Sequence, residues 1–413
     1  MGIIEWFQHN TFSSLAIRNY RLFFIGQVVS LSGTWMQTVV LGWLVIELTG
    51  SGTQLGLVVA LQFLPLLFLG PWGGVIVDRF KKRSILTATS SLYGLLVSGM
   101  ALLIFIGAIK LWMLYVFAFL LGMLRIFENT AQQTFVAEMV PEDELKNAVS
   151  LNSLAVNLAR VVGPTLGGAL IAGFGIAFCF LFNALTYVVV LIILFMMREN
   201  EINMAIPNGK KSGQLREGLR YMLADPLIKH ILLMMAVIGT FAYEFQVSLP
   251  LLADQTFHGG VASYAMLLSA MGVGSVAGGL YAAGQRKVAP QFLITFALLF
   301  GLSIVVTALL PTLDAAIAGM LFVGFFSINV LTLGNTMLQL ECVPEMRGRV
   351  MALWGVALVG STAIGGPIIG FIGEYAGARW GLAFGGLITV LAAVVAAGNL
   401  LKKDKLKTTL SVT

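Results

Sequence analysis

The stretch EMVPEDELKNAVSLNSLAVNLARVVGPTLGG (138–168) returns in altered form as ECVPEMRGRVMALWGVALVGSTAIGGPIIGF (341–371). The two copies align without a gap, and identical residues stand near both ends. The identical pairs include Glu138 and Glu341, Val140 and Val343, Pro141 and Pro344, Gly163 and Gly366, Pro164 and Pro367, and Gly167 and Gly370. Such a match indicates a chain built from two duplicated halves.

Outside this repeat the sequence is apolar for most of its length. Of its 413 residues, 58% are hydrophobic and only 11% are charged, which is typical of an integral membrane protein. Apolar runs of about 20 residues are long enough to cross a hydrocarbon core of roughly 30 Å as helices. Such runs occur near 22–47, 54–77, 84–108, 111–138, 147–173, 175–197, 227–253, 261–283, 290–311, 313–340, 349–374 and 380–401.

The sequence therefore predicts an all-α membrane protein with twelve transmembrane helices in two pseudo-symmetric six-helix bundles. The bundles are expected at 22–197 and 227–401, joined by a polar cytoplasmic linker at 198–226. A cytoplasmic N-terminal segment (1–21) and a cytoplasmic tail (402–413) complete the division. Two such bundles enclose a central cavity that opens to one side at a time, which is the architecture of a carrier and not of an enzyme.

Lys and Arg residues gather on one side of the predicted helices. They are dense in the N-terminal segment, in the loop at 79–83, in the linker and in the tail, whereas Lys110 and Arg379 fall on the other side. Cytoplasmic loops accumulate Lys and Arg, so both termini are expected in the cytoplasm, at a plasma membrane of the bacterial inner-membrane kind. This topology accounts for the net charge of +6, and no nucleic-acid partner is predicted.

The loop GGVIVDRFKKR (73–83) follows the second apolar run. It resembles the G-x-x-x-D-R-x-G-R-K loop of the major facilitator superfamily, through Gly74, Asp78, Arg79, Lys82 and Arg83. The resemblance implies the major facilitator fold and a cytoplasmic gate in which the acid meets the N-terminus of the eleventh span. A carboxylate at a helix N-terminus is stabilised by roughly 0.3–1 kcal/mol.

The Gly-Pro segments RVVGPTLGG (160–168) and GGPIIG (365–370) resemble the Gly-Pro motif of the antiporter branches of that superfamily. Proline removes a helical hydrogen bond and bends the helix, while glycine lets a neighbouring helix approach. Two interpretations stay open: a kink that limits leakage during coupling, or ordinary glycine-mediated packing. The residues concerned are Gly163, Pro164, Gly167, Gly366, Pro367 and Gly370.

Residues 26–58 and 135–164 resemble a narrower group, the exporters related to macrolide efflux pumps and the enterobactin exporter. The resemblance implies export of an amphiphilic compound in exchange for protons. Where that group has Asp-x-Pro-Ala-Arg-Gln, this chain has ENTAQQ (128–133), which lacks both the proline and the arginine. The substrate of the group is therefore not carried over.

Two opposite charges lie inside the fourth apolar run, in LRIFENTAQQTF (124–135). Arg125 and Glu128 share one helical face, and the antiparallel fifth span brings Arg160 to the same depth. An isolated charge in lipid costs at least ~2.5–3.5 kcal/mol, so Glu128 is expected to pair with Arg160, with Arg125 or with both, and to stay ionised. Such a pair either holds spans 4 and 5 together or acts as a ligand or coupling site.

Glu244 lies in the seventh apolar run and has no cationic neighbour in the sequence. Thr240 and Ser248 occupy the same helical face. A carboxyl group in apolar surroundings can exchange protons near neutrality, which makes Glu244 the proton-coupling candidate. Alternatively, the side chain lies near the outer mouth and is simply solvated, as is expected for Glu47.

Further polar and aromatic residues are candidates for the substrate cavity. Aromatic side chains supply contact area without strict geometry, so the set suits a bulky amphiphilic molecule. Each polar member alone could instead form a helix–helix hydrogen bond. The candidates are Gln27, Thr34, Trp35, Gln37, Phe127, Gln132, Gln133, Asn157, Tyr243, Gln246, Asn329, Asn335 and Trp354.

The sequence predicts a monomeric secondary transporter that exports a drug-like or siderophore-like small molecule in exchange for protons. No G-x-x-x-x-G-K-[ST] loop occurs, so ATP is not the expected energy source. With 2 cysteines and 3 histidines scattered along the chain, no cofactor and no resident metal are expected. The alternatives are an importer of a metabolite, a lipid flippase, or a transport-dead membrane sensor or scaffold.

Overall fold

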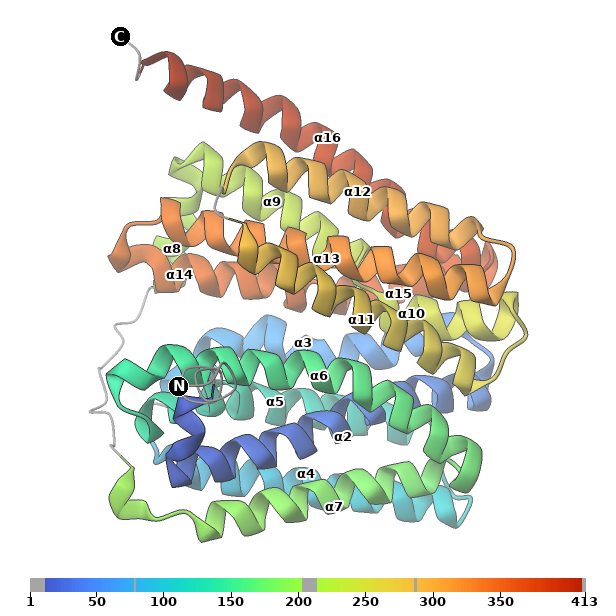
Figure 1. The fold of residues 1–413 in the computed structure, drawn as a ribbon. Helices are drawn as coiled ribbons and strands as arrows, with labels where there is room; N and C mark the ends of the chain where they lie inside the picture. The colour runs from blue at the N-terminus through green and yellow to red at the C-terminus, as the bar shows by residue number, and fades with distance from the viewer. Residues whose placement is uncertain (1–11, 78, 203–213, 286–287, 411–413) are drawn as a thin grey trace, which may run out of the picture. The chain divides into compact units, whose positions relative to one another are not determined.

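The computed structural model describes residues 12–77, 79–202, 214–285 and 288–410 (Figure 1). Within these ranges every regular element is a helix, which confirms the predicted all-α class. Among the described residues, 12 helical segments are long and apolar enough to cross a membrane. The number of spans expected from the apolar runs is therefore confirmed.

The chain forms two compact units. The first unit comprises Met1–Leu41 and Leu69–Lys210, and the second comprises Gly42–Phe68 and Lys211–Thr413. The repeat assigns residues 42–68 to the first bundle, whereas their contacts group them with the second unit. The bundle boundaries drawn from the repeat therefore stay a prediction, and each unit is described by itself.

The first unit is a bundle in which α4 packs along α7 (Figure 1). Its elements are η1 (Ser13–Ala16), α2 (Arg18–Thr49) up to Leu41, α3 (Gly52–Val77) from Leu69, α4 (Lys82–Phe105), α5 (Leu111–Met139), α6 (Glu142–Phe174), α7 (Ile176–Met196) and η2 (Glu199–Glu201). Gly175 separates α6 from α7 with a φ of 86°, a conformation that favours glycine. In the second unit Gly377 does the same between the last two helices, with a φ of 106°.

In the second unit α11 packs along α13 and α12 along α16 (Figure 1). Its elements are the remainder of α2 and α3, α8 (Gln214–Ala224), α9 (Pro226–Phe241), α10 (Phe245–Leu251), η3 (Leu252–Thr256), α11 (Val261–Gly284), α12 (Pro290–Leu309), α13 (Leu313–Glu341), α14 (Pro344–Gly355), η4 (Val356–Gly360), α15 (Thr362–Tyr375) and α16 (Ala378–Leu410). Asp225 starts α9 by accepting hydrogen bonds from the amides of Leu227 and Ile228, at 2.7 and 3.3 Å. Pro226 follows at the first helical position, which suits its missing N–H group.

Two spans of the second unit are interrupted, a feature that the apolar runs do not reveal. The seventh span consists of α9, a non-helical stretch at 242–244, α10 and the π turn η3. The eleventh span consists of α14, the π turn η4 and α15. Interruptions at membrane depth leave backbone groups outside the regular ladder, and they commonly mark binding sites.

The Gly-Pro segments pack closely against neighbouring helices. In the first unit a Cβ atom on Gly163 would lie 2.8 Å from the carbonyl oxygen of Ser32 in α2. In the second unit a Cβ atom on Gly366 would lie 3.0 Å from the carbonyl oxygen of Gly56 in α3. Close helix packing is thus confirmed at both copies, whereas the coupling role of the motif stays a prediction.

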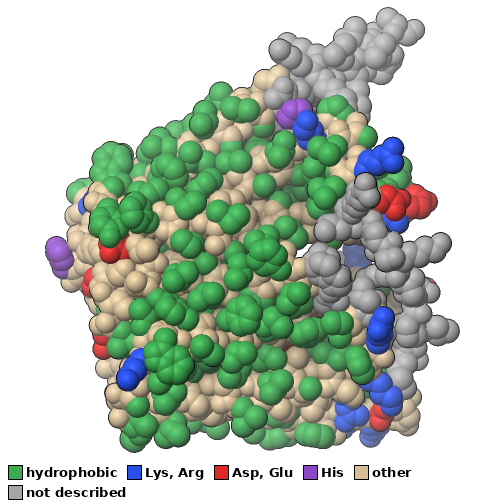
Figure 2. All heavy atoms as spheres, turned by 180° about the vertical axis from the view of Figure 1, so that it is seen from behind, with side chains coloured by type: hydrophobic (Ala, Val, Ile, Leu, Met, Phe, Trp, Pro, Cys, Tyr) green, Lys and Arg blue, Asp and Glu red, His purple; other side chains and the backbone are tan. Residues whose placement is uncertain are grey.

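Large hydrophobic side chains are exposed along the helices. Phe105 is 75% exposed, Leu280 74% and Phe195 70%. Hydrophobic side chains cover most of the face shown in Figure 2, and charged side chains gather near its margins. Soluble monomers rarely expose so much apolar surface, whereas membrane helices present it to lipid.

Candidate functional site

The first unit contains a polar cluster around Glu128. The ring of Tyr93 in α4 stacks on the ring of Tyr187 in α7, with centroids 5.1 Å apart and planes within 5°. The Tyr93 hydroxyl donates to the carbonyl of Leu121 at 3.1 Å and lies near the Glu128 carboxyl group. The charge of Arg125 acts on the same carboxyl group.

A hydrogen-bonded chain extends this cluster from α7 to α2. The Asn183 amide donates to Gln37 at 2.6 Å, and the Thr186 hydroxyl donates to Asn183 at 3.0 Å. Thr34 and Asn183 lie near the Tyr187 hydroxyl. Of the predicted cavity residues, Gln37 thus belongs to a hydrogen-bonded network inside the first unit, and Thr34 lies beside it.

The predicted ion pair is supported for one of its two arginines. Arg125 acts electrostatically on Glu128, as expected from their shared helical face. The guanidinium group of Arg160 lies over the ring of Trp35, 5.0 Å from its centroid, an arrangement of the cation–π kind. Pairing of Glu128 with Arg160 stays a prediction, and so does the role of the cluster.

Glu244 occupies the interruption between α9 and α10 in the second unit. Its side chain is buried, with the residue 2% exposed, so the solvated alternative is wrong. Cβ atoms on Gly365 and Gly366 would lie 3.0 and 3.6 Å from its two carboxyl oxygens. These glycines of α15 therefore make room for the carboxyl group.

No described cation pairs with Glu244. The Thr362 hydroxyl is close enough to interact with its carboxyl group but lacks full hydrogen-bond geometry, so both oxygens are buried without a partner. An ionised carboxylate in such a place costs several kcal/mol, whereas a protonated one costs far less.

The other candidates in the second unit lie in helix contacts. The Tyr243 hydroxyl donates to the carbonyl of Ser327 at 2.9 Å. Asn329 is 1% exposed and donates to the carbonyl of Gly278 in α11 at 3.2 Å, which fits the helix–helix alternative. Asn335 accepts from Gln339 at 2.5 Å, and Trp354 is buried against Gly334. Gln246 is half-buried.

The remaining candidates of the first unit are dispersed. Asn157 donates to the carbonyl of Ser153 on its own helix at 2.9 Å, and Gln133 is exposed. Phe127 packs on the core of the first unit. Gln27 and Gln132 instead line a common pocket.

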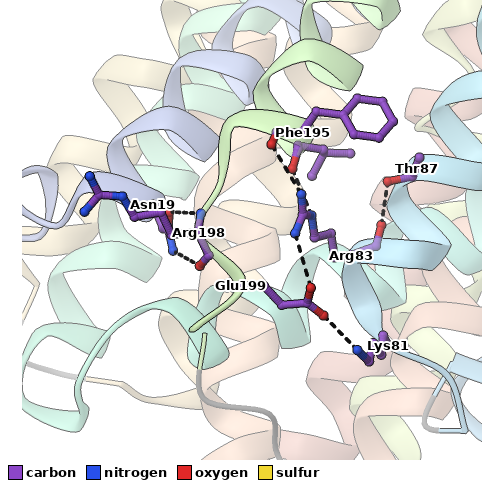
Figure 3. A network of polar contacts seen from close by, with 8 residues as sticks. Asn19, Lys81, Arg83, Thr87, Phe195, Arg198 and Glu199 are labelled. Carbon is purple, nitrogen blue, oxygen red and sulfur yellow. Dashed lines mark hydrogen bonds and ion pairs between the residues drawn. The ribbon is translucent and has the colours of Figure 1, made fainter. Parts of the chain in front are cut away.

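The basic loop after α3 is bound to the end of α7 (Figure 3). Arg83 donates to the carbonyl oxygens of Leu194 and Phe195, at 2.9 and 3.4 Å. Lys81 pairs with Glu199 at 2.7 Å, and this hydrogen bond and charge hold the pKa of Glu199 below its usual value. Arg83 thereby satisfies carbonyl groups that a helix C-terminus leaves open.

The other residues of the predicted gate loop lie in different surroundings. Lys82 is buried and donates to the carbonyl of Val77 at 3.0 Å, while Arg79 is exposed and Gly74 lies within α3. Asp78 lies outside the described residues. The expected contact of this acid with the eleventh span therefore stays a prediction.

Comparison with known proteins finds a family and several relatives. A family model described as transmembrane secretion effector matches residues 9–411. The enterobactin exporter EntS of Escherichia coli O1:K1 / APEC is 26% identical over 358 residues, covering 86% of this chain and 85% of the relative. The staphyloferrin A transporter of Staphylococcus aureus is 22% identical over 257 residues, covering 62% and 64%. The MFS-type transporter YfiS of Bacillus subtilis is 29% identical over 260 residues, which span 60% of each chain.

Solved structures share the fold. A bacterial homologue of the human lysosomal transporter Spinster, in an inward-facing and unoccupied conformation, superposes with a TM-score of 0.73 at 16% identity, covering 93% of this chain and 97% of that one. A POT family transporter in complex with 5-aminolevulinic acid gives 0.76 at 12%, covering 93% and 96%. A D-xylose–proton symporter gives 0.68 at 15%, covering 92% and 98%. At these identities the similarity concerns the fold alone.

Proposed function

Because the chain belongs to the transmembrane secretion effector family of the major facilitator superfamily, we propose that it exports a siderophore-like or drug-like amphiphile in exchange for protons. Its family and fold make it a multi-pass membrane transporter. The names of two relatives, an enterobactin exporter and a staphyloferrin A transporter, support a siderophore-type substrate and export as the direction.

The observation that carries proton coupling is the environment of Glu244. Its carboxyl group is buried, has no cationic partner among the described residues, and packs on two glycines of α15. Gly366 also contacts Gly56 of α3. Loss of the proton would place a charge beside this glycine contact and disfavour it, so proton binding and helix packing are linked.

The cluster around Glu128 supports an amphiphilic substrate. Glu128 and Arg125 are half-buried and offer both signs of charge, beside the stacked rings of Tyr93 and Tyr187. The stacked rings are buried and support the cluster, while the half-buried charges can meet polar substituents of a substrate. These charges suit a compound that carries ionisable groups.

Reconstituted vesicles test the proposal through Glu244→Gln, which removes the titratable proton and keeps the shape. We expect a fluorescent amphiphilic dye to be transported by the native chain only under an imposed pH gradient, and the variant to lose this dependence. Glu47→Gln is the matched control, because Glu47 is exposed. An unchanged pH dependence in Glu244→Gln would exclude Glu244 as the coupling acid. Gradient-independent transport by the native chain would instead favour a flippase or facilitated import.

A further inference from the structure

The interior of the first unit contains a small pocket between α2, α4, α5 and α7. Its walls are Phe23, Gly26, Gln27, Leu86, Ser90, Gln132, Val190, Ile193 and Leu194. The cavity volume among them is about 10 Å³, roughly that of one water molecule. Pockets for drug-sized ligands measure roughly 300–1,000 Å³, so a bulky substrate does not fit here.

Three polar side chains line this pocket without a protein partner. Gln27 is 4% exposed and Ser90 1% exposed, whereas Gln132 is half-buried. Across the described part of the chain, none of the three forms a hydrogen bond through its side chain with another residue. They come from three different helices, so no single helix explains the arrangement.

Ser90 differs from its neighbours on α4 in this respect. The hydroxyl groups of Thr87, Thr89 and Ser91 donate to carbonyl oxygens of their own helix, at 2.9, 3.2 and 2.8 Å. Such bonds are the usual solution for serine and threonine inside a helix. Ser90 alone in this group leaves its hydroxyl available to the pocket.

Polar side chains that line a cavity without a protein partner are commonly satisfied by water. A buried water molecule typically makes about three hydrogen bonds and needs a cavity of roughly 10–15 Å³. Gln27, Ser90 and Gln132 supply three polar side chains, and the cavity of about 10 Å³ is close to the size of one water molecule. We propose that the pocket is a water-binding site in the first unit.

The site lies one helical turn from the Glu128 cluster on each of three helices. Gln132 follows Glu128 by four residues on α5, and Ser90 precedes Tyr93 by three residues on α4. On α7, Val190 follows Tyr187 by three residues. Residues at these spacings are neighbours on a helix surface, so the water lies next to the hydrogen-bonded cluster.

The opposite end of the pocket adjoins the basic loop. Leu194 lines the pocket, and its carbonyl oxygen accepts the hydrogen bond from Arg83. Water in the pocket therefore hydrates the side of the Glu128 cluster that faces the loop end of the unit. Its use as a step in proton movement rests on the proposed function, whereas the water site itself does not.

Radiolytic hydroxyl footprinting of the full chain in lipid vesicles tests the site, because radicals form at bound water and modify adjacent side chains. We expect Phe23, a pocket wall, to be oxidised several-fold faster than the buried Phe180 of the same unit. Ser90→Val removes the hydroxyl group and fills space, and should reduce oxidation of Phe23 to the rate of Phe180. Ser91→Val is the matched control and should leave it unchanged.

Oxidation of Phe23 no faster than of Phe180 in the native chain would overturn the water site. If Ser90→Val does not fold, Gln132→Leu provides the same comparison at a half-buried position.

The role of the water site in proton movement is tested by dye transport under a pH gradient. Transport should slow in Ser90→Val and not in Ser91→Val; equal rates would overturn that role. Gradient-independent transport by the native chain, with Phe23 still oxidised, would contradict the proposed function and leave the water site standing.

Discussion

The Glu244 carboxyl group fits its buried site because two neighbouring residues are glycines. Its carboxyl group is accommodated because α15 carries glycine at 365 and 366, where any larger residue would meet the carboxyl oxygens. Gly365 also lies against the carbonyl of Thr240. The site therefore depends on these two glycines as much as on the acid itself.

Gly365→Ala is expected to destabilise the protein by about 1–3 kcal/mol, because the new methyl group overlaps the Thr240 carbonyl and crowds Glu244. The measurement is the thermal unfolding midpoint in detergent. Gly355→Ala is the control within the same span, since a Cβ atom there meets nothing within 4 Å. Similar midpoints for the two variants would contradict the packing described for α15.

At the scale of the element, charged side chains hold the ends of two helices in place. The start of α3 is held by Glu374 of α15, whose carboxylate accepts from the Ser51 hydroxyl at 2.6 Å and from the Thr53 amide at 2.8 Å. The end of α7 is held by Arg83, which reaches the carbonyl groups of Leu194 and Phe195. Each charge matches the partial charge of the helix end that it meets.

Glu374→Ala should cost about 0.5–2 kcal/mol, the usual effect of losing an N-terminal cap. The local consequence is faster hydrogen exchange of the Thr53 amide, which loses its acceptor. Exchange of this amide in Glu47→Ala should match the native chain, because Glu47 is exposed at the end of α2. Equal exchange in all three chains would show that Glu374 does not hold this helix end.

Arg83→Ala should reduce the free energy of unfolding more than Lys81→Ala does. Hydrogen bonds from a charged group contribute roughly 1.5–3 kcal/mol. The pair of Lys81 with Glu199 is exposed on both sides, at 58% and 55%, and such pairs contribute little to stability. Thermal unfolding of both variants at low and high salt separates the two contributions. A larger loss of unfolding free energy in Lys81→Ala than in Arg83→Ala would contradict this prediction.

At the scale of the whole molecule, the duplicated sequence corresponds to features repeated in both units. Each contains a Gly-Pro helix packed against a neighbour and a glycine of positive φ before the next helix. The acids of the two units do not occupy corresponding positions of the repeat: the half-buried Glu128 has Arg125 and Tyr93 nearby, whereas the buried Glu244 has no cation beside it among the described residues. The features that repeat are therefore the glycine contacts and not the acids.

Both chain termini are expected in the cytoplasm, because Lys and Arg concentrate in the loops on their side. A reporter that is active only in the cytoplasm should be active when fused after the last residue and inactive when fused after Lys110. Activity at both positions, or at neither, would contradict the predicted orientation. Fusions at both positions in the same host supply the comparison.

The twelve spans, the duplication and the charged residues inside the apolar runs could all be predicted from the amino-acid sequence. Hydropathy over about 20 residues and an ungapped repeat are properties of contiguous sequence, so they can be read before folding. Glu244 could be selected in the same way, because its lack of a cationic neighbour is visible in the chain. Asn183, Tyr93 and Tyr187 were missed because no spacing rule distinguishes them from other polar residues in apolar helices.

Three other properties depend on folding: Glu244 is buried and not solvated, its span is interrupted, and Ser90 lacks a partner while Ser91 has one. These properties depend on which helices meet and on which side chains face each other. Contacts of this kind join residues far apart in the chain, such as Glu244 and Gly365. Hydropathy and local spacing carry no information about them, since the free energy of a buried polar group depends on neighbours brought close by folding.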